Sequence, residues 1–378
     1  MKRPSGSRRA LHLTGAIVAA AIVGLSVAAC GGGGDSSAST GESGQKEQKE
    51  VSVGIELPLT GVQFAQEIKL GAEQAAEAAG GVDLSVNGPP TIEPVAAQKQ
   101  VSDMLATGLD AMGVDAFPPE AWQRTMKTLT EELDYTLAIN DKPINTPEEV
   151  SSSPLKTFVG VSAIGIARTL AEETVAAAGL GPDTTGVALV GQCVPGNAGT
   201  LYERTQGFTE VIEKKLPEVT VKVFDSKVEP AANTGAWSDA LNATPDPAIA
   251  FGTCDQDSAS IYKVKRDKGA DFPAGALEAS PSTMRGIKDG TYDAAVASNW
   301  YLLGYGAVQM LVEAAREGKP VPEGWLDPGF TPITKENVDE IEARGASVAA
   351  EVEWYAPKVK ALLGDVEASM QPMTAAFE

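Results

Sequence analysis

The chain has 378 residues, 43% of them hydrophobic, so it is long enough for two domains with a sizeable core. It holds 51 acidic and 30 basic residues, for a formal net charge of −21 at pH 7. Such a surface is poorly suited to nucleic acid or anionic lipid, so we expect no nucleic-acid partner and no electrostatic membrane binding.

Residues 1–29 have the layout of an export signal rather than of a folded element. A basic start precedes an apolar stretch at 13–25, and two small residues precede Cys30. The segment VAAC resembles a bacterial lipobox, which implies cleavage before Cys30 and attachment of diacylglycerol to its sulfur. We therefore predict an extracytoplasmic protein, lipid-anchored to the bacterial cell membrane. The alternative is an uncleaved membrane anchor with an incidental cysteine.

Residues 30–50 follow without apolar periodicity and are dominated by small, polar and charged residues. This composition is typical of a flexible tether. We expect the folded part of the chain to begin near Val51.

From Val51 onward, short apolar runs alternate with helical patterns. The expected strands of a first series are 51–57, 82–86, 109–115 and 135–140. Between the first two, apolar residues recur at helical spacing from Phe64 to Ala79, and another helix is expected over 95–106. This alternation predicts an α/β fold with a parallel sheet flanked by helices on both faces.

A proline-containing loop after residue 142 interrupts the rhythm, and a second series follows. Its expected strands are 158–161, 186–191, 219–225, 248–253, 274–279 and 294–298. Two similar series joined by a loop predict two lobes. A ligand is then expected between the lobes, beyond the carboxyl ends of the strands.

The segment LVGQCVPGNAGTLYERTQGF, at 189–208, runs from a strand through a turn into a helix. Its glycines do not fit a dinucleotide or phosphate-binding pattern, which disfavours a nucleotide site. Arg204 shares the apolar face of the predicted helix with Leu201 and Phe208, where an unpaired charge is rarely buried. We predict that Arg204 contacts a ligand in the cleft. The alternative is a pair with a structural carboxylate.

Other polar or aromatic residues also fall at the ends of predicted strands. They are Asn140, Asp141, Asp255, Glu278, Asn299 and Trp300. Carboxylates and amides exchange hydrogen bonds with hydroxyl groups, and an aromatic face stacks on the C–H face of a sugar ring. For each residue alone, a role in a turn or a helix cap is the alternative. As a set they predict a polar cleft.

An enzyme is disfavoured by the residue types available. The single histidine, His12, lies in the predicted signal, so the remaining chain has no histidine-based triad or histidine metal site. We expect no metal and no cofactor. Carboxylates such as Asp255 and Asp257 leave a glycoside hydrolase as an alternative.

The order and spacing of several segments resemble the type 1 periplasmic-binding-protein family, the sugar-binding receptors of ABC importers. The matching segments include LPLTGVQFAQEIKLGAEQAAEAAG, YTLAIND, YERTQGFTEVI, FGTCDQDSASIYKVKRDKG and GALEASPSTMRGIKDGTYDAAVASNWYLLGY, and the resemblance covers about 51–337. It implies two Rossmann-like lobes, joined by three hinge crossings, that close on a sugar or related polyol. The resemblance also implies delivery of this solute to an ABC permease, without enzymatic activity.

The resemblance also implies domain boundaries. The N-terminal lobe would comprise 51–145 and about 303–325, and the C-terminal lobe 155–298 and about 330–345. The three crossings would lie near 143–158, near 298–304 and within 319–332. We expect residues 346–378 to form a helical tail, which matches no element of the family.

Within the family pattern, Arg204 matches the arginine of R-x-x-G-F, which binds sugar hydroxyls. Phe64 lies where members carry a sugar-stacking aromatic, although it could equally be a core residue. Glu278 replaces the usual aspartate and Trp300 a common proline, which leaves the sugar unidentified. Trp122 and Trp237 are weaker ligand candidates.

After Cys30, only Cys193 and Cys254 remain. In an oxidising compartment such a pair favours a disulfide over a metal site. In the strand order of the resembled fold their strands are neighbours, which implies a Cys193–Cys254 disulfide; two buried thiols are the alternative.

Three other functions stay open beside sugar transport. One is a receptor for a nucleoside or an autoinducer-like polar solute, and another is a signalling receptor that acts with a sensor kinase. The third is the carboxylate hydrolase. In each case we expect a monomer.

Overall fold

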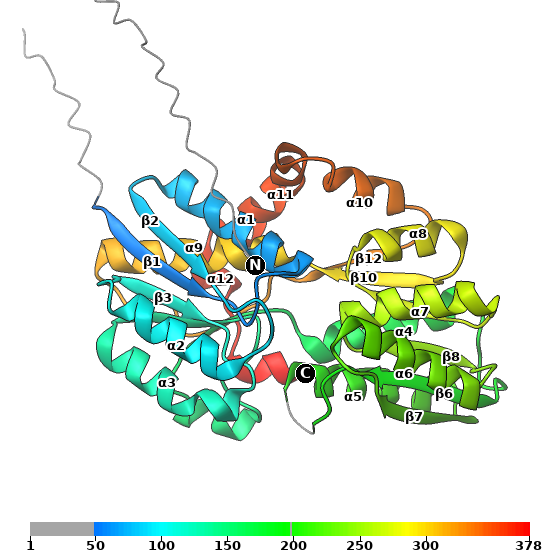
Figure 1. Cartoon of the computed structure of the whole chain (residues 1–378). Helices are drawn as coiled ribbons and strands as arrows, with labels where there is room; N and C mark the ends of the chain where they lie inside the picture. Colours follow the sequence, from blue (N-terminus) through cyan, green and yellow to red (C-terminus); the bar gives the residue numbers. More distant parts are fainter. Residues whose placement is uncertain (1–48, 197–198) are drawn as a thin grey trace, which may run out of the picture. The chain divides into compact units, whose positions relative to one another are not determined.

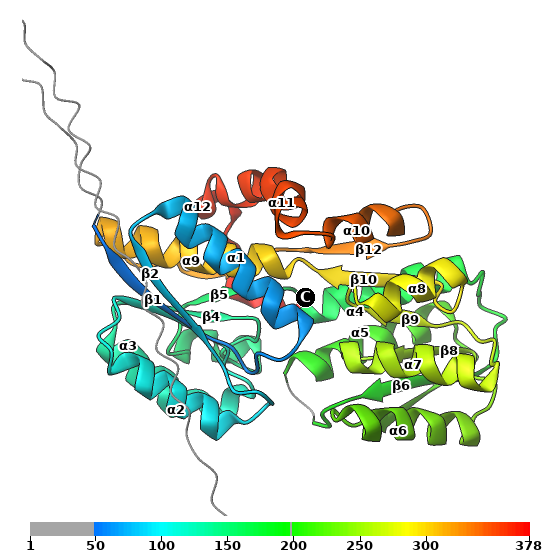
Figure 2. The ribbon, with the colours of Figure 1, turned by 45° about the horizontal axis from the view of Figure 1, so that its top comes forward.

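The structure is a computed structural model that describes residues 49–196 and 199–378 (Figures 1 and 2). The predicted signal, the predicted lipidation site at Cys30 and nearly all of the predicted tether lie outside the described residues. Within the described part of the chain, no helix combines the length and apolar character that a membrane span requires.

The first sheet contains six parallel strands and forms the centre of one lobe. Their spatial order is β11 (Gly324–Leu326), β5 (Thr157–Val159), β4 (Tyr135–Ile139), β3 (Ala111–Val114), β1 (Val51–Glu56) and β2 (Val82–Asn87). The helices of this lobe are α1 (Gln63–Ala79), α2 (Pro94–Leu105), α3 (Pro119–Glu132) and α9 (Trp300–Glu317). Strand β3 is buried along its whole length, as expected for a parallel sheet covered on both faces.

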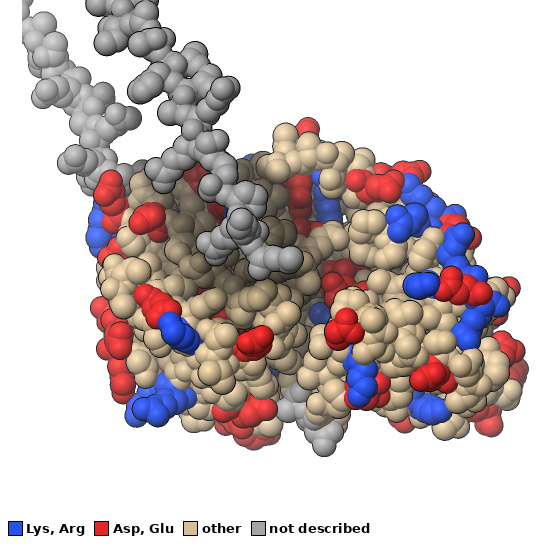
Figure 3. Space-filling view, in the orientation of Figure 1, with Lys and Arg blue, Asp and Glu red and all other residues tan. Residues whose placement is uncertain are grey.

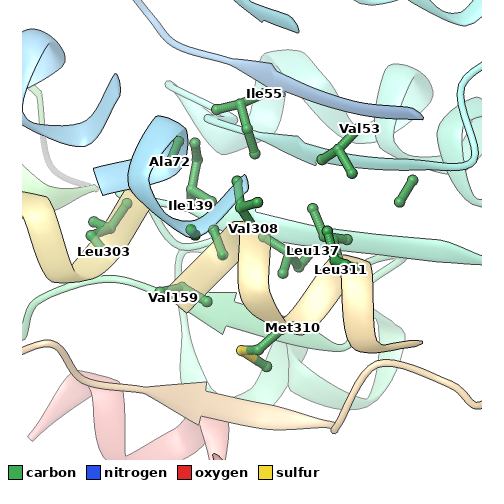
Figure 4. Packing of buried hydrophobic residues seen from close by; sticks show 14 of the residues in the cluster. Val53, Ile55, Ala72, Leu137, Ile139, Val159, Leu303, Val308, Met310 and Leu311 are labelled. Carbon is green, nitrogen blue, oxygen red and sulfur yellow. The ribbon is translucent and has the colours of Figure 1, made fainter. Parts of the chain in front are cut away.

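The core of this lobe lies between the sheet and the pair α1 and α9. Val53 and Ile55 of β1, Ile139 of β4 and Val308 of α9 converge in it (Figure 4). Helices α2 and α3 cover the opposite face with a second apolar cluster. The predicted α/β fold with helix-flanked parallel sheets is confirmed.

The second lobe is built from two three-stranded sheets joined by a bridge between Ala250 and Ala274. Across both sheets the strands run in the order β7 (Val219–Asp225), β6 (Gly186–Gln192), β8 (Ile249–Gly252), β9 (Gly275–Leu277), β10 (Ala294–Ser298) and β12 (Phe330–Ile333). Only β12 is antiparallel to its neighbour. The surrounding helices are α4 (Ala163–Ala177), α5 (Thr200–Lys215), α6 (Pro230–Ala243), α7 (Asp255–Lys268) and α8 (Pro281–Asp289).

The expected start of the second series at 158–161 is wrong. Strand β5 pairs with β4 and β11 in the first sheet. The preceding segment, with helix η1 (Pro147–Ser152), also belongs to the first lobe, because Ile144, Leu155 and Phe158 are buried in the cluster beneath α2 and α3. The chain therefore leaves the first lobe between Val159 and the start of α4, after the expected crossing at 143–158.

Three helices and a 3-10 turn follow β12. They are α10 (Val338–Arg344), α11 (Val348–Leu363), α12 (Val366–Ser369) and η2 (Met373–Phe377). Helix α10 is paired with α8 of the second lobe, whereas α11 packs on α9 of the first. Gln371 then forms a bridge with Trp325 of β11. This C-terminal segment therefore contacts both lobes.

Helices α1 and α9 approach each other through two glycines. A Cβ atom on Gly304 would lie 1.9 Å from the carbonyl oxygen of Ile68, and one on Gly71 would lie 1.9 Å from that of Tyr301. Both obstacles are backbone atoms, which do not move without shifting a helix. Glycine at these positions is therefore a packing requirement.

We expect Gly304→Ala to lower the free energy of unfolding by about 2 kcal/mol, because the added methyl group overpacks a tight contact. Urea denaturation measures the change. Gly235→Ala in α6 is the matched control, since a Cβ there meets no atom within 4 Å. The control is expected to be neutral or stabilising, because alanine favours a helix over glycine. Equal effects of the two substitutions would contradict the packing requirement.

Candidate functional site

Four of the predicted ligand residues line one small pocket between the lobes. They are Phe64, Asp255, Glu278 and Trp300. Phe64 comes from α1 of the first lobe, whereas the other three follow β8, β9 and β10 at the carboxyl edge of the second. The volume of this inner pocket is about 10 Å³, which is room for about one water molecule.

The aromatic side chains of the inner pocket are in contact. The ring centroids of Phe64 and Trp300 are 5.2 Å apart, at an interplanar angle of 42°. Trp300 donates its indole N–H to Oε2 of Glu278 over 2.8 Å. Ser298 donates to the same carboxylate from its backbone N–H and its hydroxyl, at 3.2 and 3.1 Å. These hydrogen bonds hold the Glu278 side chain in one orientation. The backbone of Glu278 adopts the left-handed conformation, with φ of 66°.

Burial controls the protonation of the two carboxyls in this pocket. It raises the pKa of Glu278 to about 7, although the positive charge of Arg204 and the hydrogen bond from Trp300 oppose the shift. Burial also raises the pKa of Asp255, against its backbone hydrogen bond and the charge of Arg204. Near neutral pH, Glu278 is present in both forms, so it can accept or donate a hydrogen bond.

Arg204 lies in α5 with only 8% of its surface exposed. One terminal N–H donates to the carbonyl oxygen of Thr253 over 2.8 Å. Its Nε is buried and has no hydrogen-bond partner within the described residues. The guanidinium also acts electrostatically on Asp141, Asp255 and Glu278, because it opposes the rise in the pKa of each. It is thus a buried cation with unused donor capacity among carboxyls of both lobes.

Asn140 and Asp141 directly follow β4 on the first lobe and do not line the inner pocket. The Asn140 amide donates to Asp115 over 2.6 Å and to Asp141 over 3.1 Å. The hydroxyl of Thr200, at the start of α5, donates to Asp141 and so joins the lobes. Burial raises the pKa of Asp141, and burial together with the charge of Asp141 raises that of Asp115 well above its usual range.

A buried ion pair beside Asp141 was not predicted. Lys142 of the first lobe lies 2.5 Å from Oε2 of Glu203 in α5, with side-chain exposures of 5% and 10%. Lys142 also donates to the carbonyl oxygen of Ala376 over 3.3 Å and lies over the ring of Phe377. In the sequence, only the position of Lys142 directly after Asp141 could have indicated a role near the site.

Asn299 is occupied by the connection between β11 and β12. Its amide donates to Pro328 over 2.9 Å and accepts from Thr331 over 3.0 Å. Both polar atoms of the amide are thus engaged by this connection, and Asn299 does not line the inner pocket.

The two weaker tryptophan candidates are core residues. Trp122 is buried, and its indole N–H donates to the carbonyl oxygen of Phe117 over 3.0 Å. Trp237 is also buried and donates to Asp257 over 2.8 Å. Trp122 lies in the first turn of α3, whereas Trp237 lies in the middle of α6 and not at the expected helix start.

A disulfide joins Cys193 and Cys254, whose Cα atoms are 6.4 Å apart. It links the segment after β6 to the start of α7, beside Thr253, which accepts from Arg204. Within residues 49–196 and 199–378, the one group with metal-ligand spacing is Cys193, Cys254 and Asp257. The disulfide uses both sulfurs of that group, so this group does not fit a resident metal.

Six further residues line the inner pocket and were not among the predicted ligand residues; three of them, Gln63, Glu67 and Arg344, have long polar side chains. Gln63 and Glu67 lie one turn apart on the same helix as Phe64, so helical spacing could have found them. Arg344 belongs to α10, and no local pattern relates it to the other pocket residues.

Two α/β lobes with polar and aromatic side chains between them are the architecture of a two-lobed binding protein rather than of an enzyme. A family model described as a periplasmic binding protein domain matches residues 53–320. The chain therefore belongs to this family of binding proteins. A search of curated proteins found no match.

Solved structures of the same architecture carry sugars. An ABC transporter solute binding protein from Agrobacterium vitis, bound with α-D-tagatopyranose, is 21% identical, with 76% of this chain and 96% of that chain covered and a TM-score of 0.68. One from Burkholderia graminis, in complex with D-arabinose, is 22% identical, with coverage of 77% and 98% and a TM-score of 0.65. A Mycobacterium smegmatis protein in complex with β-D-fucofuranose is 18% identical, with coverage of 80% and 98% and a TM-score of 0.68. At these identities the likeness establishes the fold.

Proposed function

We propose that this protein is an extracytoplasmic solute-binding lipoprotein that captures a sugar or related polyol between its lobes and delivers it to an ABC permease. The observation that carries the proposal is the inner pocket. It combines two aromatic rings, Phe64 and Trp300, with the carboxyls of Asp255 and Glu278, beside the buried guanidinium of Arg204. Sugar hydroxyls need such acceptors and donors, and the C–H face of a sugar needs an aromatic surface.

Ligand binding requires the inner pocket to enlarge. A space for about one water molecule does not admit a sugar ring, and the Phe64 and Trp300 rings are in mutual contact. Separation of the lobes, or of the two rings, would open the site. A ligand that contacts both lobes would then favour the closed arrangement by its differential contacts.

The fold of the sugar-bound solved structures supports the same class of ligand by analogy. The segment VAAC supports anchoring through a diacylglyceryl group on Cys30, with residues 30–50 as the tether. The negative net charge favours solubility and disfavours binding to nucleic acid. We expect it to act as a monomer.

A thermal-shift screen tests the proposal. Pentoses, hexoses, inositols and nucleosides are each added in excess to the protein without its signal. We expect at least one sugar or polyol to raise Tm, because a ligand that binds only the folded state stabilises it. If only nucleosides raise Tm, the proposed ligand is a nucleoside rather than a sugar. If no carbohydrate raises Tm, the proposal is contradicted.

A further inference from the structure

A second and larger chamber adjoins the inner pocket. Its volume is about 570 Å³, and α1, α8, α10 and α11 form its walls. Figure 3 shows the surface hollowed beneath the α10 and α11 segment, with acidic and basic side chains at the hollow. The two spaces share four wall residues, Gln63, Glu67, Ala279 and Arg344. The outer chamber therefore adjoins the site proposed for the sugar, and these shared side chains lie between the two spaces.

The roof of this chamber lies beyond residue 320, where the family model ends. It is attached to both lobes. Lys288 of α8 pairs with Asp339 at 2.7 Å and with Glu342 at 2.5 Å on α10. Tyr355 of α11 stacks on Tyr301 of α9, with ring centroids 4.7 Å apart and planes 2° from parallel. The C-terminal segment thus supplies one side of an open chamber, and that side lies outside the part of the chain that the family model matches.

Arg344 is the polar group common to both chambers that has unused donors. Only 5% of its surface is exposed, and one terminal N–H donates to the hydroxyl of Tyr355 over 3.0 Å. Within the described chain, no carboxylate lies within ion-pair distance of its guanidinium. A guanidinium carries five N–H donors, so several remain for a bound molecule.

The lining determines what kind of molecule fits. Apolar side chains come from α1, α8, α10 and α11: Leu70, Met284, Ile341 and Val348. Glu67, Glu73, Glu342 and Glu351 line the same space, against two cations, Lys69 and Arg344. An anionic ligand would meet this acidic excess, whereas a neutral ring with one apolar face and several hydroxyls would satisfy both kinds of wall.

We propose that the outer chamber binds a second ring joined to the captured sugar, so that the preferred solute is a neutral glycoside or disaccharide rather than a free monosaccharide. This inference rests on the proposed function. The inner pocket would hold the sugar that the aromatic pair and Glu278 recognise, and Arg344 would donate to the group that links the two chambers.

Isothermal titration calorimetry tests the inference with free D-glucose, D-galactose and D-xylose, their phenyl glycosides, and maltose, cellobiose, lactose and xylobiose. We expect at least one glycoside or disaccharide to bind about tenfold more tightly than its free sugar, because the second ring buries apolar surface. Equal affinities, or tighter binding of the free sugar, would overturn the inference and leave the proposed function intact. Binding of none of these probes, with no response in the wider screen, would instead remove the proposed function.

A matched pair of variants locates the second ring. Val348, the first residue of α11, lines only the outer chamber and is 56% exposed; Val95, the second residue of α2, is 81% exposed and lines neither chamber. We expect Val348→Trp to reduce the advantage of the glycoside to below about threefold, whereas Val95→Trp leaves it unchanged. Both variants should bind the free sugar as the original protein does.

A glycoside preference that Val348→Trp does not reduce would place the second ring elsewhere and overturn the assignment. If Val348→Trp does not fold, Gln66→Trp replaces it, because Gln66 is exposed on α1 and also lines only the outer chamber. The same loss of preference is expected from that variant, and its absence would count equally against the inference.

Discussion

Replacing both Cys193 and Cys254 by alanine is expected to lower the free energy of unfolding by about 4 kcal/mol. The disulfide closes a loop between residues 61 apart in the sequence, and a cross-link of that span removes much conformational freedom from the unfolded chain. Urea denaturation of protein produced under oxidising conditions measures the change. Loss of the disulfide should also weaken sugar binding. The carbonyl oxygen of Thr253 accepts from Arg204, and Thr253 directly precedes Cys254.

Reduction provides the control for this prediction. A reductant should destabilise the original protein by a similar amount and leave the double alanine variant unaffected. Thiol titration of the unfolded, unreduced chain, beginning after Cys30, should find no free thiol. Two reactive thiols per chain, or equal stability of the two proteins, would contradict a disulfide that stabilises the fold.

Arg204→Ala is expected to weaken sugar binding about a hundredfold and to abolish the thermal shift. The guanidinium is buried, its Nε lacks a partner within the described residues, and it acts on carboxyls of both lobes. Removing it would leave sugar hydroxyls without their charged donor and the nearby carboxyls without a counter-charge. Calorimetry with a sugar identified by the screen measures the loss.

Arg168→Ala is the matched control, since Arg168 lies in the same lobe but is 38% exposed and paired with Glu210. This variant should bind as the original protein does. Arg204→Lys separates charge from geometry, because lysine keeps the charge but lacks the planar fork that suits two neighbouring hydroxyls. Full affinity in a folded Arg204→Ala protein would refute the assigned role.

Local sequence patterns predicted much of the second lobe. The strands at 219–225 and 294–298 are observed with the same bounds as β7 and β10. The continuous apolar run of β10 is buried along its whole length, and the alternating run of β7 forms an edge strand with mostly half-buried or exposed residues. Arg204 was singled out because it lies on an apolar helix face. That helix face is buried in the structure, and Arg204 is buried with it.

Which sheet a strand joins was decided by tertiary structure. Strand β5 has three buried residues, and nothing in so short a run distinguishes the edge of the first sheet from the start of the second. Its pairing with β11 joins residues more than 160 positions apart, which no local period encodes. The burial of Trp122 and Trp237 was also decided by tertiary structure, because residues distant in the sequence surround each side chain and make it part of an apolar core.

Some features of the candidate site could likewise be predicted from the sequence, and others depend on tertiary structure. Residue type and strand ends indicated Glu278 and Trp300, because parallel strands bring their carboxyl ends to one edge. The sequence could not show that Lys142 meets Glu203 or that Arg344 reaches the pocket of Phe64, since those contacts form only when distant segments pack together. Local periodicity therefore determined the elements and the kind of cleft. Long-range packing alone decided which charges are paired, which donors remain unused and how large the chambers are.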